Sequence, residues 1–195
     1  DNDSIYYSII TGTTDHPNKI IGALDRGGAN GWMRSYTTSP GKSDGLNLSH
    51  LLSNYNKSLF SGHVGGTAIE NDLALSRKDY NGKNIWSKLL AAQDQNGKNV
   101  DESLTHLSFT ADSTLLLAGV VDSNSLSSFI AVADTFGNIN WSRKYSDLEA
   151  LIGFPIAYDV VKLPDSTYVI GGLSIELTLS FNLSYKGFLI KTNKR

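Results

Sequence analysis

The chain has 195 residues, enough for one domain with a sizeable buried core. Hydrophobic residues make up 40% and charged residues 18%. With a formal net charge of −2 and no long block of like charge, neither nucleic acid nor an anionic membrane surface is an expected partner. No run of about 18 apolar residues is present to span a bilayer, and the absence of cysteine excludes disulfides and thiolate metal sites.

Short apolar or alternating runs bounded by glycine, proline, asparagine and serine predict β-strands along the whole chain, and no segment carries a sustained helical period. In chain order, strands are expected at residues 5–11, 19–24, 32–36, 46–53, 58–61, 72–75, 104–109, 114–118, 128–133, 139–145, 158–163, 167–170 and 187–191. Glycines are expected to close several of these strands, namely Gly12, Gly62, Gly119, Gly171 and Gly172. The sequence therefore predicts an all-β fold.

One motif, Asp-x-x-Gly-x-x-x-Trp, occurs three times and uses all three tryptophans of the chain. Its copies are Asp25, Gly28 and Trp32; Asp79, Gly82 and Trp86; and Asp134, Gly137 and Trp141. The tryptophans are separated by 54 and 55 residues, a spacing typical of one supersecondary unit duplicated in tandem.

The chemistry of the motif indicates a β-hairpin. The aspartate can accept a hydrogen bond from the backbone two residues further on, and the glycine tolerates the positive φ that closes a tight turn. The tryptophan then begins the return strand, where its large ring can cover a neighbouring repeat. A structural role is therefore predicted for the nine motif residues.

Four strands of this kind make one full repeat of about 54 residues, with repeats expected at residues 1–37, 38–92, 93–147 and 148–195. Tandem four-stranded meanders predict a β-propeller, here about three and a half blades within a single segment, residues 1–195. A β-sandwich is the alternative all-β fold, but it gives no reason for the motif to recur in register.

The repeats also resemble a known group of sequences. NGKNIWSK (81–88), FGNINWSRKY (136–145), YDVVKLPDSTYVIGG (158–172) and GFLIKTN (187–193) are similar to the tandem propeller repeats of secreted and cell-surface proteins. More loosely, they resemble the tryptophan-docking repeats of quinoprotein-like propellers. The resemblance implies a propeller fold and an extracellular or cell-surface location, while repeat motifs of this kind say little about function.

One polar pattern is a candidate site. His50 and His106 stand at matching places on the first strand of their repeats, and Tyr158 is assigned the same place in the fourth repeat. In a propeller these strands lie nearest the central channel, so the three residues could form a polar ring that holds an anion, a metal or another ligand. The alternative is ordinary packing between blades, with the histidine nitrogens bonded to the backbone. The histidines show no zinc-binding spacing, and neither a catalytic residue nor a cofactor is predicted.

Five Asn-x-Ser sequons support an extracellular glycoprotein. Asn47, Asn56 and Asn182 flank expected turns and are the better candidate acceptors, while Asn2 and Asn140 complete the set.

Two functional classes remain open at this stage. The first is a non-enzymatic structural or binding module of a surface assembly that contacts protein or glycan partners. The second is a quinoprotein-like enzyme or cofactor-binding propeller with its site at the central channel. The first repeat lacks an expected inner strand and the last lacks an outer strand. A protein partner or further copies of the chain are therefore expected to complete the propeller, with head-to-tail filaments as one outcome.

Overall fold

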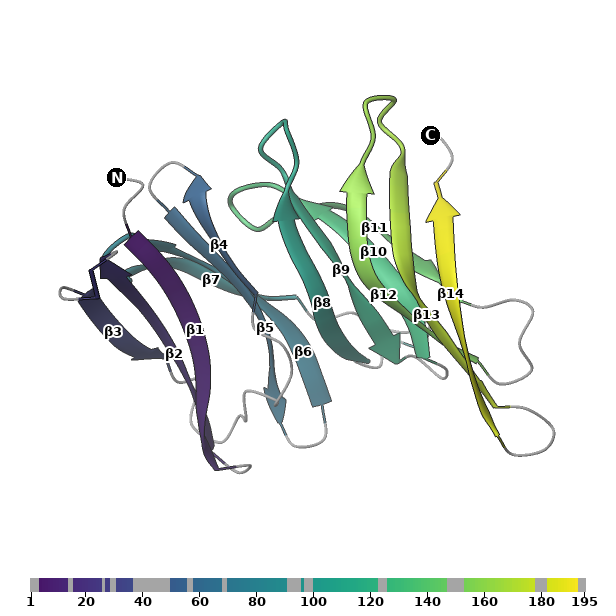
Figure 1. The fold of residues 1–195 in the computed structure, drawn as a ribbon, viewed down its shortest axis with the longest axis horizontal. Helices are drawn as coiled ribbons and strands as arrows, with labels where there is room; N and C mark the ends of the chain where they lie inside the picture. Colours follow the sequence, from purple (N-terminus) through teal and green to yellow (C-terminus); the bar gives the residue numbers. More distant parts are fainter. Residues whose placement is uncertain are drawn as a thin grey trace. The chain divides into compact units, whose positions relative to one another are not determined.

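The computed structural model describes residues 4–13, 16–25, 27–28, 31–36, 50–55, 58–67, 70–90, 96, 100–122, 126–146, 153–177 and 182–192. These residues form antiparallel strands joined by turns, and none of them lies in a helix, which confirms the predicted all-β class (Figure 1). Within these ranges no helix is long and apolar enough to cross a membrane. The chain divides into two compact units, Asp1–Ala92 and Gln93–Arg195, called here the N-terminal unit and the C-terminal unit.

The N-terminal unit contains two antiparallel sheets, each a meander in which consecutive strands are neighbours. The first sheet consists of β1 (Ser4–Thr13), β2 (His16–Asp25) and β3 (Gly31–Tyr36). The second consists of β4 (His50–Tyr55), β5 (Ser58–Thr67), β6 (Glu70–Asp79) and β7 (Asn84–Leu90). The strand expected at residues 46–53 is described from His50 onward, and its earlier residues lie outside the described ranges.

The C-terminal unit also contains two antiparallel meanders, but here the four-stranded sheet comes first in the chain (Figure 1). Its first sheet consists of β8 (Asp101–Phe109), β9 (Leu115–Asp122), β10 (Leu126–Ala133) and β11 (Ile139–Tyr145). Its second sheet consists of β12 (Gly153–Lys162), β13 (Tyr168–Leu177) and β14 (Leu183–Lys191). Below, these are called the β8–β11 sheet and the β12–β14 sheet.

β1 ends one residue after Gly12, close to the expected place. For Gly62, Gly119, Gly171 and Gly172 the expectation that a glycine ends its strand is wrong, because the strands run straight through these residues. β9 continues past Gly119 to Asp122, and β13 continues past Gly171 and Gly172 to Leu177. A Cβ atom at Gly119 would collide with the Ser103 carbonyl oxygen, and one at Gly172 with the Ile156 carbonyl oxygen. Glycine here permits close approach of a neighbouring strand at a β-bulge, rather than ending its own strand.

The core of the C-terminal unit lies between its two sheets and joins β9 and β10 to β12 and β13. Its buried residues are Leu116, Ala118, Ile130, Val132, Ala157, Val160, Tyr168 and Ile170. Partly buried Trp141, Tyr145, Phe188 and Ile190 pack against them. Burying a leucine, isoleucine or valine side chain stabilises the fold by about 1.5–3 kcal/mol, so this packing holds the two sheets face to face.

Candidate functional site

The motif hairpins have the predicted turn chemistry. Asp79 Oδ1 accepts backbone hydrogen bonds from Asn81 at 2.9 Å and Lys83 at 2.8 Å. Asp134 Oδ1 accepts the equivalent bonds from Phe136 and Asn138, both at 2.8 Å. The glycines of all three motifs have positive φ, at 69° for Gly28, 76° for Gly82 and 77° for Gly137. The side chain of Asp25 lies outside what the structure describes.

Two of the motif tryptophans contact the next repeat, as predicted. In the N-terminal unit, a Cβ atom at Gly82 would lie 2.5 Å from Cζ3 of Trp32, so the Trp32 ring lies directly against the hairpin turn of the second sheet. In the C-terminal unit, the Trp141 ring meets the Tyr168 ring edge to face, with centroids 5.1 Å apart. Trp86 is the third residue of the return strand β7 and is half-buried.

His106 links the two sheets of the C-terminal unit through side chains. Its Nδ1 lies 3.0 Å from Asp159 Oδ1, and its Nε2 lies 2.8 Å from Ser108 Oγ. An ionised carboxylate can only accept, so Nδ1–H donates to Asp159 and Nε2 of the neutral ring accepts the Ser108 hydroxyl proton. Partial burial lowers the pKa of His106, and the negative charge of Asp159 opposes that shift. The arrangement is a polar clamp between sheets, and its nitrogens bond side chains rather than the backbone.

Asp159, rather than Tyr158, occupies the place in the fourth repeat that matches His106. His106 pairs with Ala118 one residue after the bulge in β8, and Asp159 pairs with Gly171 one residue after the bulge in β12. Tyr158 sits in that bulge and is exposed, so its assignment to the histidine position is wrong by one residue. His50 pairs with Gly62 at the start of β4, and its side chain is not among those that the structure describes. Whether these positions face a channel stays a prediction.

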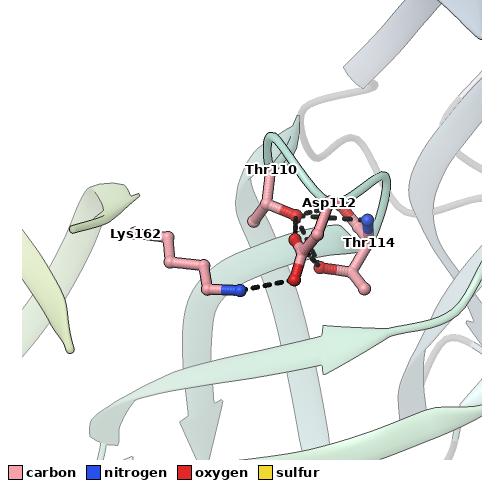
Figure 2. Close-up of polar contacts among 4 residues, drawn as sticks. All are labelled: Thr110, Asp112, Thr114 and Lys162. Atoms are coloured by element: carbon pink, nitrogen blue, oxygen red, sulfur yellow. Dashed lines mark hydrogen bonds and ion pairs between the residues drawn. The ribbon is translucent and has the colours of Figure 1, made fainter. Parts of the chain in front are cut away.

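A second polar contact joins the β8–β9 turn to β12 (Figure 2). Asp112 Oδ2 lies 2.6 Å from Lys162 Nζ, while Asp112 Oδ1 accepts a 2.5 Å hydrogen bond from Thr110 Oγ1. These bonds lower the pKa of Asp112 to about 2, with the Lys162 hydrogen bond as the largest cause, and that same bond raises the pKa of Lys162. Asp112 therefore fixes its own turn and the neighbouring sheet together.

The β12–β13 turn repeats this chemistry. Asp165 Oδ1 accepts from Thr167 Oγ1 at 2.5 Å, and Asp165 Oδ2 lies 3.2 Å from Lys191 Nζ. The bonds from Thr167, first that of the side chain and then that of the backbone, lower the pKa of Asp165 to about 2. Sequence reasoning missed both aspartates, although Asp-Ser-Thr recurs at residues 112–114 and 165–167 and was a usable signal.

Lys78, directly before the motif residue Asp79, is also a residue that sequence reasoning missed. Its side chain is almost fully buried, and Nζ donates a 2.6 Å hydrogen bond to Ser76 Oγ. Burial lowers the pKa of Lys78 to about 8, because a charged ammonium loses its hydration there.

A groove of about 300 Å³ lies beside the Trp141–Tyr168 contact. Its walls are Trp141, Ser142, Arg143 and Tyr145 from β11, Ser166 and Tyr168 from the neighbouring sheet, and Thr192 just after β14. The Arg143 guanidinium lies 5.5 Å from the centroid of the Tyr145 ring. A second hollow of about 190 Å³ shares Tyr145 and is lined further by Ser128, Ser146, Pro155, Ser174, Phe188 and Ile190. The groove therefore offers aromatic faces, hydroxyls and one cation.

Among the candidate glycan acceptors, Asn182 lies just before β14 and is exposed. Asn47 and Asn56 lie outside the described residues, and Asn140 is exposed on β11. In the part of the chain that the structure describes, no three histidine or carboxylate side chains are grouped closely enough to hold a metal ion.

Compared with known proteins, the chain matches no protein-family model and no curated protein.

Proposed function

We propose that this chain is a β-propeller segment that acts as a non-enzymatic structural or binding module of an extracellular or cell-surface assembly, through protein–protein or glycan contacts. Face-to-face packing of a four-stranded meander on a three-stranded meander in the C-terminal unit supports the propeller. The recurrent contact of a motif tryptophan with the next repeat supports it further.

One observation carries the proposal of a protein partner, and it compares two equivalent residues. Ile130 pairs with Ala118 on the β8–β11 sheet and is 0% exposed, because the β12–β14 sheet covers it. Leu189 pairs with Gly171 at the matching place on the β12–β14 sheet and is 80% exposed. The same repeat position is thus buried in one sheet and open in the next.

The open face extends well beyond Leu189. On β14, Leu183 and Tyr185 are also exposed, at 56% and 60%, and on β12 Val161 is 49% exposed. Cross-strand pairs put them on one face, since Val161 lies opposite Val169, Leu189 opposite Gly171, and Tyr185 opposite Ile175. A contiguous apolar face of this kind marks a protein interaction site.

The occupant we infer is the first sheet of a second copy of the chain. Tyr168 lies at the start of β13 and packs against the preceding sheet; its backbone carbonyl accepts a hydrogen bond from the Thr192 N–H, and its own N–H donates to Thr192 Oγ1. Ile5 on β1 has the matching position, since it pairs with Leu24, the residue before motif Asp25. Both positions carry large, mainly hydrophobic residue types, and on this match we infer that the first sheet of one copy covers the open face of another. Such a head-to-tail contact is heterologous and builds rings or filaments.

Sedimentation velocity over a range of concentrations tests this proposal. The 195-residue chain should associate as its concentration rises, and Leu189→Lys should weaken that association strongly, because a charge would be buried in the contact. Phe136→Lys is the matched control, since Phe136 is 64% exposed and belongs to the β10–β11 turn of the other sheet. A chain that stays monomeric at every concentration, or equal effects of the two variants, would overturn the self-association.

The extracellular location has its own test. Mass spectrometry of natural material should find glycan on Asn182, which is exposed, and on Asn47 or Asn56. Unmodified asparagine at every sequon would remove this support for a secreted or surface protein.

A further inference from the structure

Asn81 stands directly before the turn glycine of the second motif copy, and Asn-Gly is a chemically labile pair. The backbone nitrogen of the glycine can attack the asparagine side chain, because glycine has no Cβ to hinder the close approach. The other two motif copies carry Gly27 and Phe136 at this place. Among the three motif hairpins, the second therefore combines the turn of the repeat with a sequence that deamidates.

The reaction joins the Gly82 nitrogen to Cγ of Asn81 and breaks the bond from Cγ to Nδ2. The side-chain nitrogen leaves as ammonia and carries the proton of the Gly82 amide with it. Water then opens the cyclic imide at either of its two carbonyl carbons, which leaves aspartate or isoaspartate. Water is the single co-reactant, so the conformation at Gly82 controls how fast the step occurs.

The folded turn holds the Gly82 nitrogen away from this reaction. Its N–H donates to the Asp79 carbonyl oxygen at 3.0 Å, inside a turn that Asp79 Oδ1 closes through the amides of residues 81 and 83. Gly82 is buried, although Asn81 itself is exposed. Closing the imide ring requires the Gly82 amide to turn out of its hydrogen bond, so the intact turn slows the reaction.

Trp32 of the first sheet covers the same glycine. Its Cζ3 and Cη2 atoms lie 2.5 Å and 2.7 Å from the point where a Cβ of Gly82 would stand, and Arg34 Cδ lies 2.9 Å from that point. The Gly82 peptide has little room to turn while the ring lies there. We infer that Asn81–Gly82 is a deamidation site gated by Trp32, which reacts when the first sheet moves off the turn of the second.

The isoaspartate product makes that opening irreversible. In isoaspartate the backbone runs through the side-chain carbons, which adds one atom to the chain between residues 81 and 82. The amides of residues 81 and 83 then no longer both reach Asp79 Oδ1, where they lie at 2.9 Å and 2.8 Å in the intact turn. The surface on which Trp32 docks is lost with the turn, so the modification records each separation of the two sheets.

Peptide mass spectrometry of the full 195-residue chain, incubated near neutral pH, measures the rate at Asn81. A synthetic peptide of residues 76–90 gives the rate of the same pair without the fold. The folded chain should deamidate at least about tenfold more slowly than the peptide, because the reaction requires local opening. Trp32→Ala should raise the rate in the chain by at least about fivefold, since opening then costs less.

Two controls belong to the other unit. The Asn96–Gly97 pair is an internal reference, because Asn96 is exposed and lies in the C-terminal unit, and Trp32→Ala should leave its rate unchanged. Trp141→Ala removes the tryptophan of the third motif copy and should leave the rate at Asn81 unchanged. Trp32→Phe keeps a smaller ring on the turn, so its rate at Asn81 should lie between those of the wild type and Trp32→Ala.

Three results would overturn the inference. Equal rates at Asn81 in the folded chain and in the peptide would show that the fold gives no protection. An unchanged rate in both Trp32 variants would show that the ring is not the gate. Equal acceleration by Trp141→Ala and Trp32→Ala would assign the protection to stability of the whole chain rather than to the Trp32 contact.

Discussion

Trp141 and Tyr168 join the two sheets of the C-terminal unit, with ring centroids 5.1 Å apart and ring planes inclined by 65°. This edge-to-face geometry directs the positive edge of one ring toward the negative face of the other, and it contributes about 0.5–1.5 kcal/mol beyond burial. The contact also forms one wall of the groove beside β14. A residue of the repeat motif therefore both stabilises the fold and shapes the candidate binding surface.

We expect Trp141→Ala to lower the free energy of unfolding of the C-terminal unit by about 2–3 kcal/mol, since a half-buried ring loses less than the ~3–5 kcal/mol of a buried one. Urea denaturation followed by circular dichroism measures the change. Phe136→Ala is the control, because Phe136 is 64% exposed and should cost little. Similar losses from the two variants would contradict a structural role for Trp141.

Gly82→Ala and Gly28→Ala separate the cost of backbone conformation from the cost of contact. Both glycines have positive φ, so each alanine should cost about 1–2 kcal/mol for left-handed backbone. Nothing lies within 4 Å of a Cβ at Gly28, whereas one at Gly82 meets Trp32 at 2.5 Å. Gly82→Ala should therefore be the more destabilising by about 1–3 kcal/mol in thermal or urea unfolding. Equal effects would show that Trp32 does not dock on this turn in solution.

The aspartates of the β8–β9 and β12–β13 turns should make stability fall in acid. The pKa values of Asp112 and Asp165 are about 2, below their ordinary value of 3.8. Between pH 3.8 and about 2 the unfolded chain binds more protons at these two aspartates than the folded chain does. The stability that the two carboxylates contribute is therefore present above pH 3.8 and is lost as the pH falls toward 2.

Asp112→Asn should therefore lose less stability than the wild type as the pH is lowered from 5 to 2, measured by urea unfolding at each pH. The exposed Asp122 supplies the control, and Asp122→Asn should follow the wild-type curve. If the free energy of unfolding of Asp112→Asn and of the wild type fell in parallel with pH, the Lys162 contact would contribute nothing to stability.

Lys78→Met should stabilise the N-terminal unit at pH 7, because the wild type buries an ammonium whose pKa falls from 10.5 to about 8. Above pH 8 the folded wild type loses this proton before the unfolded chain does, so its stability rises up to pH 10.5 and the advantage of methionine shrinks. Unfolding midpoints measured from pH 7 to pH 10.5 check this, with exposed Lys83→Met as the control. An advantage of methionine that does not vary with pH would rule out the protonation argument.

The Ser108–His106–Asp159 chain has the hydrogen-bond distances of a hydrolytic triad, 2.8 Å and 3.0 Å. Our proposal of a non-enzymatic module predicts that it serves packing alone. Hydrolysis of p-nitrophenyl acetate by the wild type and by Ser108→Ala should then agree within about twofold. A loss of tenfold or more in the variant, or a burst of nitrophenol equal to the protein concentration, would make Ser108 a nucleophile and refute the proposal.

The sequence by itself determined the strand-rich class and the motif hairpins, because turn chemistry acts over four residues. Asp79 meets its two amide donors at residues 81 and 83, so that outcome needs no distant partner. Only the tertiary structure decided which residues face one another across sheets. A single bulge residue at Tyr158 shifts the pairing by one and brings Asp159 to His106, and Asp112 meets Lys162 from 50 positions away in the chain. The glycines that look like strand ends are instead places where neighbouring strands approach closely. These features depend on long-range packing and strand register, and a local pattern of residues predicts neither of them.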